Sequence, residues 1–262
     1  MSEDGITTSI ATSDGQTITV RGYDLVSELI GRYTYTEILY FLICNRFPDA
    51  GQTRILDACL VTLAEHGITP SSIVSRIIAD NVPGESQVAI AAGLLAVGSV
   101  FVGTLEGCAR ILEEGARSHA SELQAYCERV AREHKERRLP LPGFGHPIHK
   151  PDDPRTPRLF QIAREAGARG NHVALVQMLG RSLDEVHGRH LTINATGAIA
   201  ALLLEIGLPV QSMRAIAVTA RAGGLTGHVM EEAQQRTGRL LWRVAEESIP
   251  FVDPRVTRRE AP

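Results

Sequence analysis

The sequence predicts an all-α fold that carries one short β-hairpin near its N-terminal end. Apolar residues recur at helical spacing from Tyr23 almost to the C-terminus. The alternating pattern of strands appears only in residues 7–20, on both sides of a turn at Ser13-Asp14-Gly15. With 262 residues, of which 44% are hydrophobic, the chain can bury a substantial core. We therefore expect about ten helices, joined by loops of ordinary length.

Composition and charge narrow the classes of partner. The formal net charge of −3 gives no electrostatic reason to expect a nucleic acid or an anionic membrane. The sequence offers no uninterrupted apolar run of about eighteen residues, and its start lacks a basic segment followed by an apolar one. We therefore expect a soluble cytoplasmic protein. The cysteines show no C-x-x-C spacing, which predicts reduced, buried thiols at Cys44, Cys59, Cys108 and Cys127.

Two helices are expected after the hairpin. Thr34-Tyr35-Thr36-Glu37 has the form of a capping box and should begin a helix that runs to about Asn45. A second helix, from about 51 to 65, should end at Gly67. His66 would then lie in the last turn of that helix, where capping or packing is its default role.

An almost wholly apolar helix is expected over residues 85–102. Its composition of alanine, glycine, leucine and valine predicts a central, closely packed position. The small residues at 103–109, which follow directly, contain a single acidic side chain, Glu106. That carboxylate can be a charge at a helix N-terminus, stabilised by the helix dipole, or a catalytic group, and the residues themselves leave both interpretations open.

A proline-rich loop follows a charged helix expected over residues 118–138. Residues 141–159 hold five prolines and two glycines together with His146, Lys150 and Arg155. The segment can be a stiff linker or a shaped loop that binds an anion. We favour the loop, because linkers rarely place ionisable groups beside glycine turns, and because Arg155 comes just before a new helix N-terminus that suits an anion.

The C-terminal part should be helical as well. In residues 184–190, acids and histidines at helical spacing indicate surface pairing more than metal binding, because no third ligand is evident. The other expected elements are a helix over 171–189, an apolar helix ending at 207, two helices over 212–220 and 222–247 hinged at 221–224, and a loosely ordered tail from 253. A domain boundary within the loop divides the chain into 1–140, 141–155, 156–250 and 251–262.

Several motifs resemble the citrate synthase superfamily, and the short chain is most similar to its citryl-CoA lyase-like members. Gly143-Phe144-Gly145-His146 and Asp153-Pro154-Arg155 match the most specific motif of the family. Residues 20–25 match its N-terminal element, and Arg221 with His228 matches its small-domain pattern. The resemblance implies a citrate synthase-like multihelical fold, with a large and a small helical part.

The resemblance also implies roles for individual residues. His146 would hydrogen-bond the keto or hydroxyl oxygen of the substrate and act as a general acid. His66 would bind the oxaloacetate or citrate moiety. The carboxylates of that moiety would be held by guanidinium groups, with an asparagine beside them: Arg155, Arg221 and Asn194. Coenzyme A would lie against Gly143, Phe144, Gly145 and Lys150.

Two positions depart from the family pattern. Glu106 stands where citrate synthases have the histidine that stabilises the enol of acetyl-CoA, and Thr196 stands where they have the aspartate that abstracts the methyl proton. A threonine hydroxyl does not act as a carboxylate base near neutral pH. Glu106 could donate to the enolate oxygen, or organise it, if burial raised its pKa.

The resemblance therefore predicts a carbon–carbon lyase that converts citryl-CoA, or a related hydroxyacyl-CoA, to acetyl-CoA and oxaloacetate. A Claisen-type synthase and a non-catalytic protein that binds coenzyme A or dicarboxylates are the alternatives. We expect a coenzyme A thioester as substrate, and no metal or redox cofactor. A homodimer is also implied, with residues 88–98 available for its apolar interface.

Overall fold

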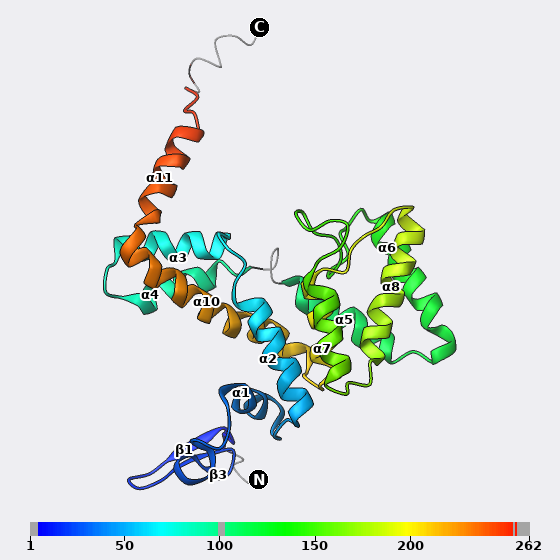
Figure 1. The fold of residues 1–262 in the computed structure, drawn as a ribbon, viewed down its shortest axis with the longest axis horizontal. Coiled ribbons are helices and arrows are strands. Elements are labelled where there is room, and N and C mark those ends of the chain that lie inside the picture. Colours follow the sequence, from blue (N-terminus) through cyan, green and yellow to red (C-terminus); the bar gives the residue numbers. More distant parts are fainter. Residues whose placement is uncertain (1–4, 99–102, 254, 256–262) are drawn as a thin grey trace. The chain divides into compact units, whose positions relative to one another are not determined.

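The computed structural model describes residues 5–98, 103–253 and 255, and it confirms the all-α class (Figure 1). Strands β1 (Ala11–Ser13), β2 (Ile18–Val20) and β3 (Tyr23–Asp24) form one antiparallel sheet in that order. The carboxylate of Asp14 accepts hydrogen bonds from the backbone of Gln16 and Thr17, which closes the expected hairpin. Among the described residues, no helix is both long and apolar enough to cross a membrane.

The contacts divide the chain into two compact units. The first unit takes Met1–Thr62 and Ser99–Ala217, and the second takes Leu63–Gly98 and Val218–Pro262, as far as the chain is described. The loop at 141–155 thus belongs to the first unit, and the boundary expected within that loop stays a prediction.

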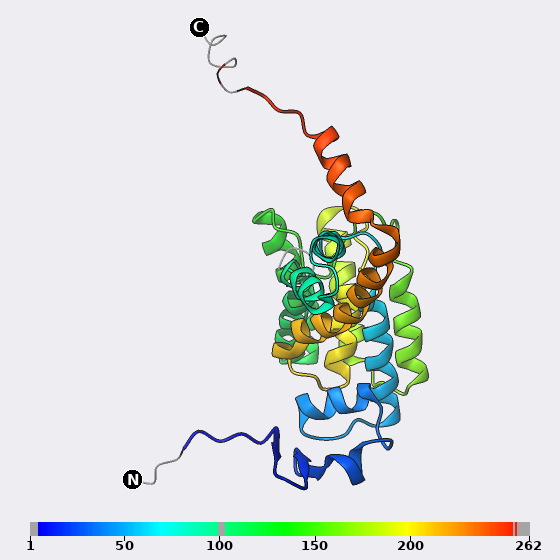
Figure 2. The same ribbon diagram turned by 90° about the vertical axis from the view of Figure 1, so that its left-hand side faces the viewer.

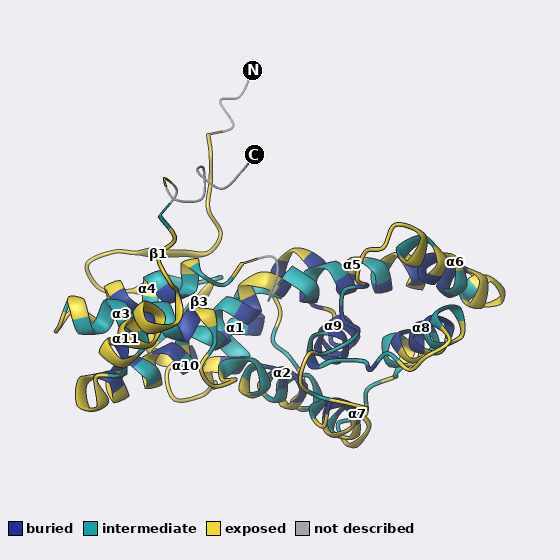
Figure 3. Cartoon of the chain, turned by 90° about the horizontal axis from the view of Figure 1, so that it is seen from above, coloured by how far each residue is buried: buried dark blue, intermediate teal, exposed yellow. Residues whose placement is uncertain are grey.

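The helices of the first unit include one that is buried. They are α1 (Tyr35–Cys44), most of α2 (Ala50–Ala64), α5 (Gly103–Ala116), α6 (Leu123–Glu136), α7 (Arg155–Glu165), α8 (Asn171–His187) and α9 (Ala195–Glu205), with short turns at η1 (Leu25–Leu29), η2 (Ala120–Glu122) and η3 (Val210–Ser212). Helix α9 is apolar on all sides, packs against α5, α7 and α8, and is buried from Gly197 to Leu204 (Figure 3). The N-terminus of α9 is therefore a fixed point of the first unit.

The second unit is built from α3 (Pro70–Asn81), α4 (Ser86–Leu95), most of α10 (Met213–Gln235) and α11 (Thr237–Ser248). Helices α3 and α4 pack together, and α11 packs on α3. The buried Arg76 of α3 forms an ion pair with the buried Glu232 of α10, with 3.1 Å between Nη1 and Oε2. Glu232 also accepts a hydrogen bond from the amide of Gly238. This polar cluster holds α3, α10 and the start of α11 together.

Two expectations about the helices are wrong. Helix α4 is not central: within it only Ala89 and Gly93 are buried, on the face that packs against α3 and, at Gly93, against Leu225 of α10. Residues 99–102, at the end of the expected helix, lie outside the described residues. The hinge at 221–224 is also absent, because α10 is continuous there and breaks only at Arg236, whose φ is +49° (Figures 1 and 2).

Close packing explains why the glycines at 223–224 do not break α10. A Cβ on Gly224 would overlap the carbonyl oxygen of Ala64, whereas a Cβ on Gly223 would meet open space. Gly224 is therefore a site of close approach between two backbones and not a hinge.

Gly223 and Gly224 give a matched test of this packing. Gly224→Ala should lower the free energy of unfolding by about 2–4 kcal/mol, because the backbone of Ala64 must move. Gly223→Ala should leave it unchanged or raise it by up to about 1 kcal/mol, because alanine favours the helix. Urea unfolding followed by circular dichroism measures both variants, and equal midpoints would contradict the assignment.

Candidate functional site

The proline-rich loop is fixed to the N-terminus of α9 by backbone hydrogen bonds. Phe144 and Ile193 form an antiparallel bridge, and the amide of Gly145 donates to the carbonyl of Thr192 at 2.8 Å. The amide of Asn194 donates to the carbonyl of Gly143 at 3.1 Å. The side-chain amide of Asn194 donates to the carbonyl of Gly145 at 2.8 Å. The loop is therefore a held part of the first unit.

Glycines are required where the loop passes α5 and α9. Gly143 has a φ of +87°, and a Cβ on it would lie 2.6 Å from Sγ of Cys108 and 2.9 Å from Cα of Gly197. A Cβ on Gly197 would in turn overlap the carbonyl oxygen of Gly143. Gly143 and Gly197 thus allow the loop and α9 to approach each other closely.

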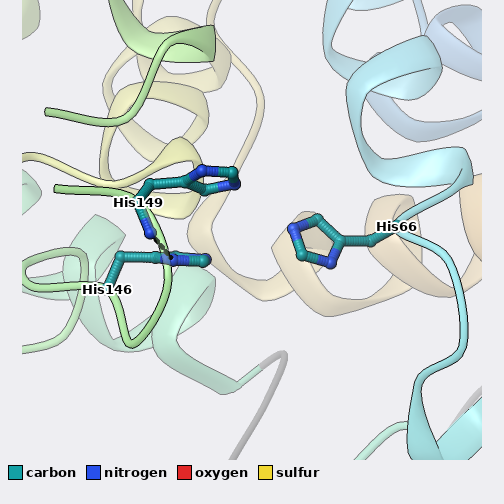
Figure 4. A group of neighbouring side chains, drawn as sticks. All are labelled: His66, His146 and His149. Atoms are coloured by element: carbon teal, nitrogen blue, oxygen red, sulfur yellow. Dashed lines mark hydrogen bonds between the residues drawn. The ribbon is translucent and has the colours of Figure 1, made fainter.

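The ring of His146 is held by the backbone of its own loop. Its Nδ1 accepts hydrogen bonds from the amides of Ile148, at 3.1 Å, and His149, at 2.9 Å. The imidazole rings of His146 and His149 stack with 4.4 Å between centroids, as Figure 4 shows. Because Nδ1 accepts, the proton of the neutral ring is on Nε2. His146 is therefore set up as a hydrogen-bond donor through Nε2.

Asp153 fixes the guanidinium of Arg155. Asp153 is fully buried, and its two oxygens accept from Nε of Arg155 at 2.9 Å and from Nη2 at 2.7 Å. It also accepts from the amide of Ala195, at the start of α9. Burial would raise the pKa of Asp153, but the hydrogen bonds and charge of Arg155 and the amide of Ala195 lower it to about 2. Arg155 remains 26% exposed and is thus held in place at the surface.

Thr196 contributes a neutral hydroxyl group. Its Oγ1 donates to Oδ1 of Asn194 at 2.7 Å and lies 3.2 Å from Oγ1 of Thr104, in the first turn of α5. The same oxygen of Asn194 accepts from the amide of Gly197 and caps α9. Thr196 is therefore part of a hydroxyl and amide network, and no carboxylate contacts its hydroxyl among the described residues.

The structure contradicts the condition for a proton role of Glu106, which was a pKa raised by burial. Its Oε1 accepts from Arg110 at 2.5 Å, and its Oε2 lies 3.3 Å from Nε of Arg214. The hydrogen bond from Arg110, together with the charges of both arginines, lowers the pKa of Glu106, although burial acts in the opposite direction. Glu106 is ionised at neutral pH and is not a protonated donor.

The ring of Phe144, one of the expected contacts of coenzyme A, is buried against Gly180 of α8 and belongs to the core. Gly143 is buried as well, whereas Lys150 is exposed. A role for these residues in binding coenzyme A stays a prediction.

Two predicted substrate-binding residues, His66 and Arg221, belong to the second unit. His66 follows the end of α2 at Ala64, and does not lie in the last turn as expected. Oε1 of Glu65 accepts from the amides of His66, at 2.8 Å, and Gly67, at 2.6 Å. Glu65 was not among the residues predicted from the sequence, and its position beside His66 was the signal available.

Arg221 carries a buried charge in the same unit. Its Nη1 is buried without a hydrogen-bond partner in the described chain and lies 3.9 Å from Oε2 of Glu65. Burial lowers the pKa of Arg221, while the carboxylate of Glu65 acts in the opposite direction. Such a guanidinium can hold a further carboxylate.

His190, in the segment of acids and histidines at 184–190, has two carboxylate partners. His190 lies 2.7 Å from Asp184 and 3.0 Å from Asp152, and its hydrogen bonds to these carboxylates raise its pKa. The surface pairing expected in 184–190 is confirmed.

The cysteines are free thiols, and three of them are buried as expected, while Cys44 is half-buried.

Comparisons with known proteins agree on one family. The family described as citrate synthase, C-terminal domain, matches residues 46–245. The structure of citryl-CoA lyase from Hydrogenobacter thermophilus is 32% identical and similar with a TM-score of 0.79, over 88% of this chain and 88% of that chain. A citrate synthase from Acidithiobacillus ferridurans is 26% identical over 198 residues, which are 73% of this chain and 50% of that protein.

A second similar structure is that of ATP citrate lyase from Methanothrix soehngenii in complex with citrate and coenzyme A. It has a TM-score of 0.79 at 20% identity and covers 95% of this chain and 42% of that chain. The expected citrate synthase-like fold is thus confirmed. The chain spans about half the length of the first curated relatives that it matches.

Proposed function

The chain belongs to the citrate synthase family, and on this premise we propose that it is a lyase that cleaves the carbon–carbon bond of citryl-CoA or a related hydroxyacyl-CoA. One observation carries the proposal: the groups suited to an oxyacid are held in place, while Thr196 supplies no carboxylate base. The similarity to citryl-CoA lyase over most of both chains supports a lyase over a synthase.

The reaction requires proton transfer at the oxygen of the carbon that carries the tertiary hydroxyl. When the hydroxyl loses its proton, the bond breaks, the oxygen becomes a keto group, and the electron pair moves to the acyl-CoA enolate, which is then protonated. We assign Nε2 of His146 to this oxygen. In the direction of condensation it donates its proton and the ring becomes an imidazolate, which the two amides at Nδ1 stabilise. Cleavage is the reverse step, in which the imidazolate takes up the hydroxyl proton.

Guanidinium groups are assigned to the carboxylates of the oxyacid. Asp153 holds one edge of Arg155 in a bidentate pair, so that the orientation of Arg155 is fixed before a ligand binds. Arg221 of the second unit has a buried Nη1 that a ligand carboxylate would satisfy. We propose that both residues bind substrate, as do His66 and Asn194.

The acyl side uses neutral hydroxyl groups in this proposal. Thr104 and Thr196 lie at the N-terminal ends of α5 and α9, where the helix dipoles favour negative charge on an enolate oxygen. Because the hydroxyl of Thr196 donates to Asn194, the hydroxyl of Thr104 is the donor assigned to that oxygen. Lys150 is proposed to contact a phosphate of coenzyme A. The guanidinium and imidazole groups supply recognition themselves, so we propose no metal or redox cofactor.

A comparison of acyl-CoA substrates tests the activity. Citryl-CoA should yield oxaloacetate, detected by a coupled dehydrogenase, at a rate that rises with protein concentration. A Claisen-type synthase would instead release free coenzyme A from an acyl-CoA and oxaloacetate. A non-catalytic binding protein would be stabilised against heat by these ligands without forming any product. Release of free coenzyme A, or stabilisation by the ligands without product, would overturn the proposal that the protein is a lyase.

Glu106 should tolerate loss of its charge. Glu106→Gln should lower kcat less than about tenfold, because an ionised carboxylate held by Arg110 and Arg214 donates no proton, whereas loss of a proton donor would remove about 10²–10⁴-fold. Glu113→Gln is the control, because it alters a surface pair between Glu113 of the same helix and Arg117, just beyond the end of that helix. Complete loss of turnover in Glu106→Gln alone would restore a proton role to Glu106.

We also propose a cytoplasmic homodimer with α4 in its interface. Val88 and Leu95 are 38% and 89% exposed, and the helix between them is rich in alanine and glycine. An apolar helix face of this kind favours burial against a second copy. Light scattering of the purified protein measures the mass, and a monomer would contradict the proposal.

A further inference from the structure

A chain of polar contacts in the second unit leads from the core to the backbone of His66. It begins at Arg76, whose side chain is 3% exposed and whose Nη1 lies 3.1 Å from the buried Glu232. Nε of Arg76 donates to Nδ1 of His228 at 2.9 Å. The network continues from His228 to Glu65 and so reaches the end of α2.

Arg76 determines the tautomer of His228. Because a guanidinium always donates, Nδ1 of His228 carries no proton, and the proton of the neutral ring is on Nε2. That nitrogen is buried and lies 3.1 Å from Oε2 of Glu65, in a close polar contact that does not have hydrogen-bond geometry.

Glu65 connects this ring to the backbone at His66. Its other oxygen, Oε1, accepts from the amides of His66 and Gly67, and the turn needs Gly67 at a φ of +74°. Burial would raise the pKa of Glu65, but the contact with His228 and the backbone hydrogen bonds of His66 and Gly67 lower it. The carboxylate is therefore ionised, and its two oxygens face different partners.

From this geometry we infer that Glu65 is a positioning residue for His66 and Arg221, and that His228 and Arg76 fix Glu65. The inference rests on the proposed function, in which His66 and Arg221 bind the oxyacid. Glu65 sets the backbone from which the His66 ring projects, and it lies 3.9 Å from the buried Nη1 of Arg221. Support of this kind commonly changes ligand affinity by about 10–100-fold.

Two substitutions of His228 separate positioning from simple packing. A glutamine amide nitrogen can take the place of Nε2 and donate to Glu65, whereas an asparagine oxygen can take the place of Nδ1 and accept from Arg76. The inference predicts that His228→Gln keeps the affinity for oxaloacetate, and that His228→Asn weakens it about tenfold. A role limited to anchoring Arg76 predicts the opposite order, which would overturn the inference.

Glu65→Ala gives a second measurement that does not depend on catalysis. Amide hydrogen exchange at His66 and Gly67 should become at least about tenfold faster, and oxaloacetate should bind about tenfold more weakly by calorimetry, while acetyl-CoA binding is unchanged. Glu247→Ala, at an exposed acid of α11, is the control. Unchanged exchange and oxaloacetate affinity in Glu65→Ala would refute the inference, even if the wild-type protein cleaves citryl-CoA. Failure of wild-type cleavage would refute the proposed function alone.

Discussion

His146→Asn is expected to lower the rate of citryl-CoA cleavage by about 10²–10⁴-fold. The asparagine oxygen can replace Nδ1 as the acceptor for the amides of Ile148 and His149, so the loop should keep its backbone. The variant lacks an N–H at the position of Nε2, and with it the proposed proton transfer at the substrate oxygen. Steady-state kcat measures the loss.

His149→Asn is the control for this variant. His149 stacks on His146, but its hydrogen bond to His146 comes from its backbone amide, which any side chain retains. We expect less than about tenfold change in kcat, as expected for a side chain outside the proton transfer. A His146→Asn protein that is folded and turns over at the wild-type rate would remove His146 from the mechanism.

Asp153→Asn is expected to lower both stability and substrate binding. The variant leaves Arg155 without its carboxylate and weakens the acceptor for the amide of Ala195, so the free energy of unfolding should fall by about 3 kcal/mol. Arg155 then loses its fixed orientation, and KM for citryl-CoA should rise. Urea unfolding and steady-state kinetics measure the two effects. An unchanged unfolding midpoint would show that the pair contributes nothing to stability.

The same carboxylate predicts a dependence of stability on pH. Its folded pKa of about 2 lies below the ordinary value of 3.8, so its ionised form stabilises the fold above about pH 4. That contribution, about 2 kcal/mol, is lost as the pH falls from 4 toward 2. The difference in unfolding free energy between the wild type and Asp153→Asn should therefore shrink over this range. A constant difference would contradict the low pKa.

Local signals in the sequence predicted local structure well. The capping box at 34–37 and the turn at Ser13-Asp14-Gly15 depend only on neighbouring residues, and both are present. The position of α4 and the continuity of α10 depend on which distant backbone packs against a glycine or an alanine. The glycines at 223–224 led us to predict a hinge. The carbonyl of Ala64, which explains Gly224, is far away in the sequence and could not be recognised from it.

In the candidate site, too, local features were easier to predict than contacts between residues far apart in the sequence. The sequence motif at 143–155 identified His146 and Arg155 as candidates. Asp153, which holds Arg155, is its near neighbour in the sequence. Arg214, by contrast, reaches Glu106 only through the fold, and its charge helps to lower the pKa of Glu106, whereas a proton donor would need a raised pKa. Sequence patterns thus identified the residue types, whereas the charges around them came from long-range packing.

A single turnover of citryl-CoA with the protein in excess tests the central claim most directly. The quenched mixture is analysed by mass spectrometry for acetyl-CoA, oxaloacetate, citrate and free coenzyme A. We predict acetyl-CoA and oxaloacetate in equal amounts. Recovery of intact citryl-CoA from a folded protein that binds it, or formation of citrate and free coenzyme A, would contradict a carbon–carbon lyase.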